Sequence, residues 1–178
     1  MALTQGIRRG VLVAWLLVIA AVVIPVVVRM ASPAPGPGIV LVRADGSERA
    51  IHLAQVKRLP ALTRKGTYQN QFGNWRDEGV YTGVLLSDLV GKDTDFTGIR
   101  VVATDGYEVT IDRARVLDPD YPVVLAYAFD GQEVPAWSDG FRTAVLPEDG
   151  SVSNEEYHAV SAGSYWVKNV ARLVLLSD

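Results

Sequence analysis

The sequence contains no cysteine and only two histidines, His52 and His158, among its 178 residues. Without cysteine the chain has no disulfide, no thiolate ligand for zinc or an iron–sulfur cluster, and no cysteine nucleophile. Two histidines are too few for a multi-histidine metal site. Basic residues are also outnumbered, 17 against 20 acidic ones. Because nucleic-acid-binding proteins usually carry a basic surface, we expect no nucleic-acid partner.

Charge is absent from one long stretch near the start of the chain. Residues 10–28 hold no charged side chain, and 17 of these 19 residues are apolar. A helix of that length nearly spans a hydrocarbon core of about 30 Å. The sequence therefore predicts a transmembrane anchor at 10–29, after a cytoplasmic N-terminus at 1–9 and before a Pro/Gly linker at 30–38.

The flanking arginines predict the orientation of this anchor. Arg8 and Arg9 precede the apolar stretch and Arg29 follows it, so the positive-inside rule favours a cytoplasmic N-terminus. We expect a single-pass protein of the cell membrane whose remaining chain, 39–178, is extracytoplasmic. The alternative is a cleaved signal peptide and a secreted protein, but signal peptides usually have apolar regions of about 7–15 residues.

The part of the chain expected to be exported, 39–178, is acidic, and its pattern predicts one α+β domain. From Met30 onward the chain has 14 basic and 20 acidic residues. Turn signals at Asp45-Gly46 and Asp105-Gly106 predict two β-hairpins, and strands joined by hairpins favour mostly antiparallel sheets with a few short helices. The expected strands are 39–42, 49–53, 99–103, 107–111, 123–129, 141–146 and 170–176, with short helices at 53–59 and 84–90.

Two segments lack a strand or helix pattern. The first, 66–83, interleaves four aromatic residues with amides, and we expect it to be an irregular binding surface. The second, 147–163, is a long loop of the kind that is usually functional or disordered. The adjacent carboxylates Asp77-Glu78 are more typical of an exposed turn than of an acid/base pair.

The order of several short motifs resembles the oxidoreductase molybdopterin-binding domain, which has the sulfite-oxidase-type fold. The resemblance covers roughly residues 51–175. Its motifs are the run Thr67–Val90 with Tyr81-Thr82-Gly83-Val84, Leu59-Pro60, Asp105-Gly106-Tyr107, Leu125-Ala126-Tyr127 with Asp130-Gly131, Gly140 with Arg142 and Pro147, and Lys168 within Trp166–Val170.

The resemblance implies the fold and a pocket, but the chain departs from the family at the metal. Enzymes of the family bind molybdenum through a cysteine that would fall near residues 68–74, and this chain has none. A thiolate is a soft anionic ligand that tyrosine or asparagine does not replace. The family's histidine before its glycine is Asp139 here, and its second tryptophan is Asn169.

Three functions follow from these observations. The leading hypothesis is a non-catalytic module that binds a small anionic or pterin-like ligand through Tyr68, Asn70, Trp75, Arg142 and Lys168. Aromatic faces would stack a ring while the two cations hold a phosphate or carboxylate. The alternatives are a small molybdopterin-dependent oxidoreductase without a protein thiolate, and an accessory membrane subunit that presents 66–83 to a membrane-protein partner. We expect no catalytic residue, no protein metal ligand and no resident cofactor, with molybdopterin as the alternative.

Overall fold

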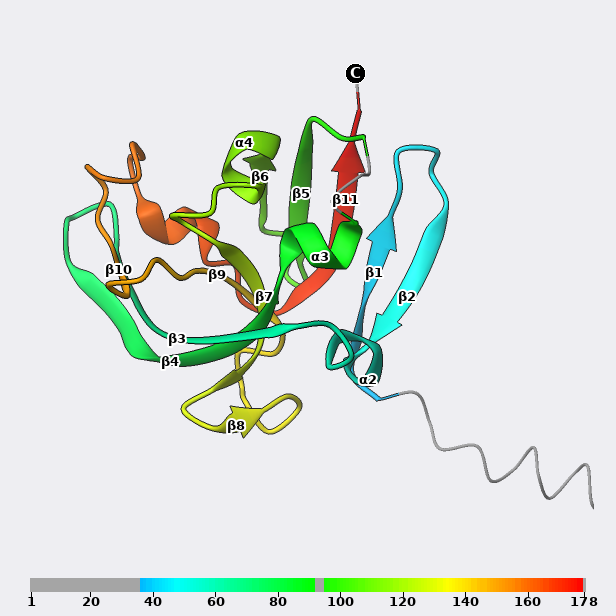
Figure 1. The fold of residues 1–178 in the computed structure, drawn as a ribbon, viewed down its shortest axis with the longest axis horizontal. Helices are drawn as coiled ribbons and strands as arrows, with labels where there is room; N and C mark the ends of the chain where they lie inside the picture. Colours follow the sequence, from blue (N-terminus) through cyan, green and yellow to red (C-terminus); the bar gives the residue numbers. More distant parts are fainter. Residues whose placement is uncertain (1–35, 92–94, 178) are drawn as a thin grey trace, which may run out of the picture. The chain divides into compact units, whose positions relative to one another are not determined.

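The computed structural model describes residues 36–91 and 95–177, which fold into two β-sheets (Figure 1). The predicted anchor at 10–29 and the N-terminus at 1–9 lie outside the described residues. Within 36–91 and 95–177, no helix is long and apolar enough to cross a membrane.

The first sheet has five strands and contains both predicted hairpins. Its order is β2 (Glu48–His52), β1 (Gly38–Val42), β11 (Val170–Leu176), β5 (Gly98–Ala103) and β6 (Glu108–Asp112). The β1–β11 pair is parallel, and the others are antiparallel. Gly46 and Gly106 take positive φ at the two hairpin turns, which explains the glycine after each aspartate.

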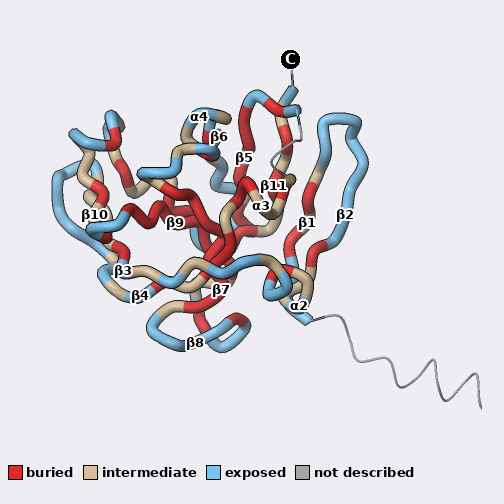
Figure 2. Tube along the Cα trace, viewed as in Figure 1, coloured by how far each residue is buried: buried red, intermediate tan, exposed pale blue. Residues whose placement is uncertain are grey.

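The second sheet has six strands and carries the candidate site. It runs β10 (Ser151–Val152), β3 (Ala61–Gln69), β4 (Trp75–Leu85), β7 (Val123–Phe129) and β8 (Gln132–Glu133), while β9 (Arg142–Val145) also pairs with β7. Here β10 pairs with β3 in parallel and the remaining pairs are antiparallel. Buried residues run through β7 and β9, whereas the ends of the β3–β4 hairpin are exposed (Figure 2).

The helices are short, as the sequence predicts. They are α2 (Leu53–Val56), α3 (Leu86–Val90), α4 (Arg113–Val116) and the 3₁₀ turn η1 (Ala162–Tyr165). The mixed, mostly antiparallel α+β class is confirmed. The segment 147–163 is largely without regular structure, as expected, apart from β10 and the start of η1.

Two predictions of local structure are wrong. The helix expected over 84–90 begins only at Leu86, because β4 continues to Leu85. The segment 66–83 is not irregular: it forms most of the β3–β4 hairpin, whose register runs from Ala61 opposite Val84 to Gln69 opposite Trp75.

Glycine conceals the strand pattern of β4. The residues that face inward alternate as Asp77, Gly79, Tyr81 and Gly83, so the usual run of apolar side chains is missing. A Cβ added to Gly83 would lie 2.5 Å from the backbone oxygen of Leu125 on β7. Only glycine therefore allows β4 and β7 to pair this closely.

Candidate functional site

Arg142 is the centre of the candidate site. It begins β9 and is 1% exposed, which is rare for a charged side chain without partners. Its guanidinium carbon lies 5.7, 5.8 and 5.5 Å from the ring centres of Tyr68, Tyr81 and Trp166. The three rings enclose the cation and favour it through their negative faces.

Two carboxylates neutralise this buried cation. Arg142 donates from Nη2 to Asp77 Oδ2 at 2.6 Å and from Nη1 to Asp139 Oδ2 at 2.9 Å. Tyr68 donates its hydroxyl to the same Asp77 oxygen at 3.1 Å. Lys168 Nζ lies 3.4 Å from Asp77 Oδ2 and 3.1 Å from Asp139 Oδ2. Two cations and two carboxylates form the cluster, so its formal charges cancel.

Three separate segments bring this charge cluster together. Asp77 projects inward from β4 because it shares the inner face with Tyr81, whose hydroxyl donates to the Asp77 backbone oxygen at 2.7 Å. Asp139 stands three residues before Arg142, across a turn in which Gly140 has a φ of 61°. Lys168 is held beside this turn, since the backbone N–H of Asn169 donates to Asp139 O at 2.7 Å.

Two buried N–H groups in the same cluster have no acceptor among the described residues. They are Arg142 Nε and Trp166 Nε1. Both are shielded from solvent, so neither presents a donor to a ligand that approaches from outside. The terminal nitrogens of Arg142, Nη1 and Nη2, are both already paired with carboxylates.

The charges shift the titration of the groups around Arg142. Partial burial acts to raise the pKa of Asp77, but the hydrogen bond and charge of Arg142, together with Lys168 and Tyr68, outweigh it and hold this pKa below its usual value. Burial raises the pKa values of Tyr68 and Tyr81, so both hydroxyls stay protonated. At neutral pH Asp77 is therefore ionised and both tyrosines are neutral.

The lowered pKa of Asp77 makes the domain sensitive to acid. A group whose pKa is lower in the folded state stabilises the fold above its unfolded pKa of about 4, and this contribution is lost as the pH falls through the folded value. We expect Asp77→Asn to weaken the dependence of the melting temperature on pH between about 5 and 2. Glu78→Gln is the matched control, because the ion pair of Glu78 with Lys65 is exposed, so solvent screens it and the lowered pKa of Glu78 contributes little to stability. If the melting temperature of Asp77→Asn depends on pH as strongly as that of the wild type, Asp77 is not held ionised by Arg142.

The structure brings together three of the five residues predicted from the sequence. Arg142 and Lys168 belong to the charge cluster, and Tyr68 donates a hydrogen bond to its Asp77. Asn70 and Trp75 instead lie at the end of the β3–β4 hairpin. The Asn70 side-chain oxygen accepts the backbone N–H groups of Phe72 and Asn74 at 2.9 and 3.1 Å, so this residue shapes the turn. The predicted binding role of the five residues stays a prediction.

The sequence reasoning missed the two carboxylates and two of the rings, Tyr81 and Trp166. Asp77 was interpreted as part of an exposed turn, and that is wrong, because it faces Arg142 from the inner side of β4. A usable signal was present: Asp77 and Tyr81 are four residues apart, which places them on one face of a strand. Asp139 stands three residues before Arg142, but spacing alone does not reveal that pair.

The residues present do not fit the molybdenum cofactor of the resembled family. The chain has no thiolate, and the two cations expected to hold a phosphate are neutralised by Asp77 and Asp139. In the part of the chain that the structure describes, no group of three or more histidine, aspartate or glutamate side chains could hold a metal ion.

Comparison with known proteins supports the fold and no more. No protein-family model matches the sequence, and no curated protein matches it significantly. Among solved structures, the chain is similar to the sulfane dehydrogenase SoxCD from Paracoccus pantotrophus, with a TM-score of 0.57 and 14% identity. The match covers 80% of this chain and 38% of that chain, so the likeness extends over well under half of the larger protein. It supports a sulfite-oxidase-type fold.

Proposed function

We propose that this protein is a membrane-anchored, extracytoplasmic binding module that uses a sulfite-oxidase-type fold without molybdenum redox catalysis. The charge cluster is the observation that carries the absence of molybdenum catalysis in this proposal. Arg142, the buried cation of the site, already has both terminal nitrogens paired with carboxylates of its own chain.

An anionic cofactor would have to displace these carboxylates. Charge-assisted hydrogen bonds are roughly twice as strong as neutral ones, and Asp77 would be left beside the incoming anion. Like charges placed side by side in a partly buried site oppose binding. The module therefore has the fold, but the two cations that would bind an anion are already paired with carboxylates of the same chain.

Titration with inorganic phosphate tests this part of the proposal. We expect no saturable chemical-shift change at Lys168 and Arg142 in the wild-type protein at millimolar phosphate. Asp77→Asn combined with Asp139→Asn frees both cations, and this double variant is expected to bind phosphate. Saturable binding by the wild type at the cluster would overturn the proposal.

The membrane anchor of the proposal rests on the sequence of residues 10–29. The absence of cysteine makes its orientation easy to measure, because any cysteine introduced is the only one in the chain. In intact cells, a membrane-impermeant maleimide is expected to label Ser47→Cys, in an exposed turn of the domain, but to label Thr4→Cys only after lysis. The reverse pattern, or recovery of the protein in the medium, would contradict a cytoplasmic N-terminal anchor.

A second candidate function is that of an accessory subunit, and the exposed end of the β3–β4 hairpin favours it. Phe72 is 77% exposed and Trp75 is 49% exposed. A photoreactive residue at Phe72 is expected to crosslink the protein to a membrane partner. The control is the same group at Tyr107, which is 48% exposed on the other sheet. If crosslinking from Phe72 yields only the band of the protein itself, this result counts against the function of an accessory subunit.

A further inference from the structure

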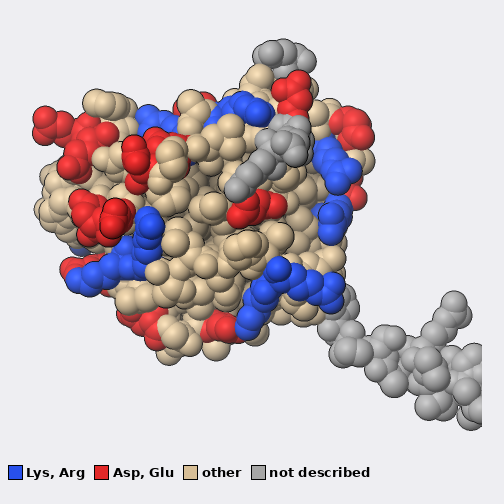
Figure 3. Space-filling model, viewed as in Figure 1, with Lys and Arg blue, Asp and Glu red and all other residues tan. Residues whose placement is uncertain are grey.

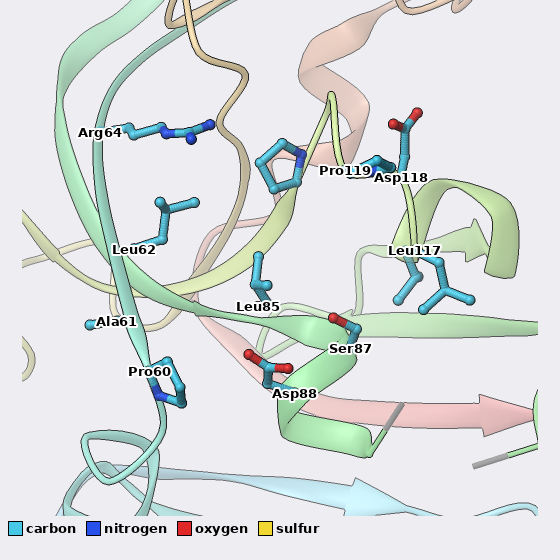
Figure 4. A pocket seen from close by; sticks show the side chains of 12 residues that line it. Pro60, Ala61, Leu62, Arg64, Leu85, Ser87, Asp88, Leu117, Asp118 and Pro119 are labelled. Carbon is cyan, nitrogen blue, oxygen red and sulfur yellow. The ribbon is translucent and has the colours of Figure 1, made fainter. Parts of the chain in front are cut away.

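A groove that no part of the proposed site uses lies beside the start of β3 (Figure 4). Its cavity has a volume of about 500 Å³ and runs between β3, the β4–α3 junction and the segment that follows α4. The walls are mainly apolar, formed by Pro60, Leu62, Leu85, Leu117, Pro119 and Pro122. In Figure 4, Leu62 and Leu85 lie between Arg64 on one side and Asp88 on the other.

The groove continues toward β10. A second cavity, of about 310 Å³, shares Arg64 and Pro119 with the first and extends to the turn at Pro147–Asp149. That turn leads directly into β10. Because the two cavities share these two lining residues, we call them together the β3 groove, which extends from Pro60 to the start of β10.

Part of β3 beside this groove has no strand neighbour. In the sheet β3 lies between β4 and β10, but β10 pairs only with Thr67 and Tyr68. Among the described residues, no strand pairs with Ala61–Gly66 on the side away from β4, and Gly150 covers the backbone oxygen of Lys65, so the open edge is Ala61–Arg64. A strand edge of this kind offers backbone N–H and C=O groups that can pair with an added chain.

The β3 groove is acidic. Besides Asp88, its lining includes four carboxylates, Asp118, Asp120, Glu148 and Asp149, against the single lining cation Arg64. The guanidinium of Arg64 donates to the backbone oxygen of Leu146 at 3.0 Å, which holds it at one wall. Figure 3 shows acidic side chains gathered on the side of the molecule that carries β10. An occupant that complements this charge carries basic side chains.

We propose that the β3 groove binds an extended, basic segment of a partner protein, which adds to β3 as a strand in line with β10. The segment pairs with the backbone of Ala61–Arg64 and with the N–H of Lys65. An apolar side chain enters the cavity between Leu62, Leu85 and Leu117, and lysine or arginine side chains face the carboxylates. The alternation of side chains along a strand suits this division, because neighbouring residues point to opposite faces. The inference rests on the proposed binding function and extends it to a surface that does not include Arg142.

Selection from a displayed library of random peptides tests the inference on the full-length protein in detergent. The enriched peptides are expected to alternate apolar residues with others and to contain lysine or arginine. On binding of a selected synthetic peptide, amide hydrogen exchange is expected to slow in Ala61–Lys65, because added strand pairing protects those N–H groups.

Variants of the groove separate this site from other surfaces. Leu117→Glu places a charge at the 40% exposed wall residue, and the reversal Asp120→Lys with Glu148→Lys removes the charge complementarity. Each is expected to weaken the peptide by about tenfold or more. Val160→Glu, at a 90% exposed apolar residue outside the groove, is expected to leave binding unchanged.

Several outcomes would overturn the inference. They are the recovery of no peptide above background, the enrichment of acidic peptides, protection outside Ala61–Lys65, and equal weakening by Val160→Glu. The phosphate titration at the charge cluster is independent of all of them, so a failure of the groove is distinguishable from a failure of the proposed function.

Discussion

Replacement of Arg142 by alanine is expected to lower the free energy of unfolding by about 3–5 kcal/mol, the range found when one partner of a buried ion pair is removed. The loss has two physical causes. Asp77 and Asp139 lose the cation that neutralises them, and among the described residues the half-exposed Lys168 is the cation left to pair with both. The three rings around the guanidinium also lose a packed neighbour, and this leaves a cavity.

Urea denaturation of Arg142→Ala measures this loss, and the matched control is Arg172→Ala. Arg172 pairs with Glu48 at the surface, where the two side chains are 43% and 53% exposed. An exposed pair contributes about 0–1 kcal/mol, so the control is expected to change little. If both variants lose the same stability, Arg142 does not organise the site.

Replacement of Gly83 by alanine is expected to destabilise the second sheet by about 1–3 kcal/mol or more, because overpacking forces backbone atoms to move. The new Cβ would lie 2.5 Å from Leu125 O and 2.7 Å from Ala126 Cα. Both atoms belong to the backbone of β7, which cannot yield as a side-chain end can. Thermal unfolding measures the effect, and we expect the melting temperature to fall by several degrees.

Gly36→Ala is the control for this substitution. No described residue lies within 4 Å of a Cβ added to Gly36, and its φ is not positive, so the added methyl group causes no clash with the described part of the chain. Its melting temperature is expected to match that of the wild type. A Gly83→Ala protein as stable as Gly36→Ala would show that β4 and β7 do not approach each other as closely as the structure indicates.

The sequence predicts the first sheet well, because its signals are local. Aspartate–glycine turns and alternating apolar residues define the hairpins around Gly46 and Gly106, and both form as expected. The hairpin of β3 and β4 escaped prediction because its inner face carries Gly79, Gly83 and Asp77 in place of an apolar run. The reasons for these residues are the close approach of β7 and the ion pair with Arg142. Both are contacts between parts of the chain that are distant in sequence.

The candidate site was predictable only in part for the same reason. The family resemblance indicates Arg142 and Lys168 as cations of a pocket, and the structure places them together. The partners that neutralise them, Asp77 and Asp139, come from separate turns and strands, so no spacing in the sequence joins Asp77 to Arg142. The absence of cysteine from the sequence and the pairing of Arg142 and Lys168 with carboxylates of the same chain both favour a function without molybdenum catalysis.

Measurement of molybdenum and pterin in the full-length protein purified from its own membranes tests whether this chain holds the molybdenum cofactor. Elemental analysis gives the metal per chain, and fluorescence of the oxidised pterin gives the cofactor per chain. We expect neither in stoichiometric amount, because the chain has no thiolate and its two cations are paired with Asp77 and Asp139. One molybdenum and one pterin per chain would contradict it.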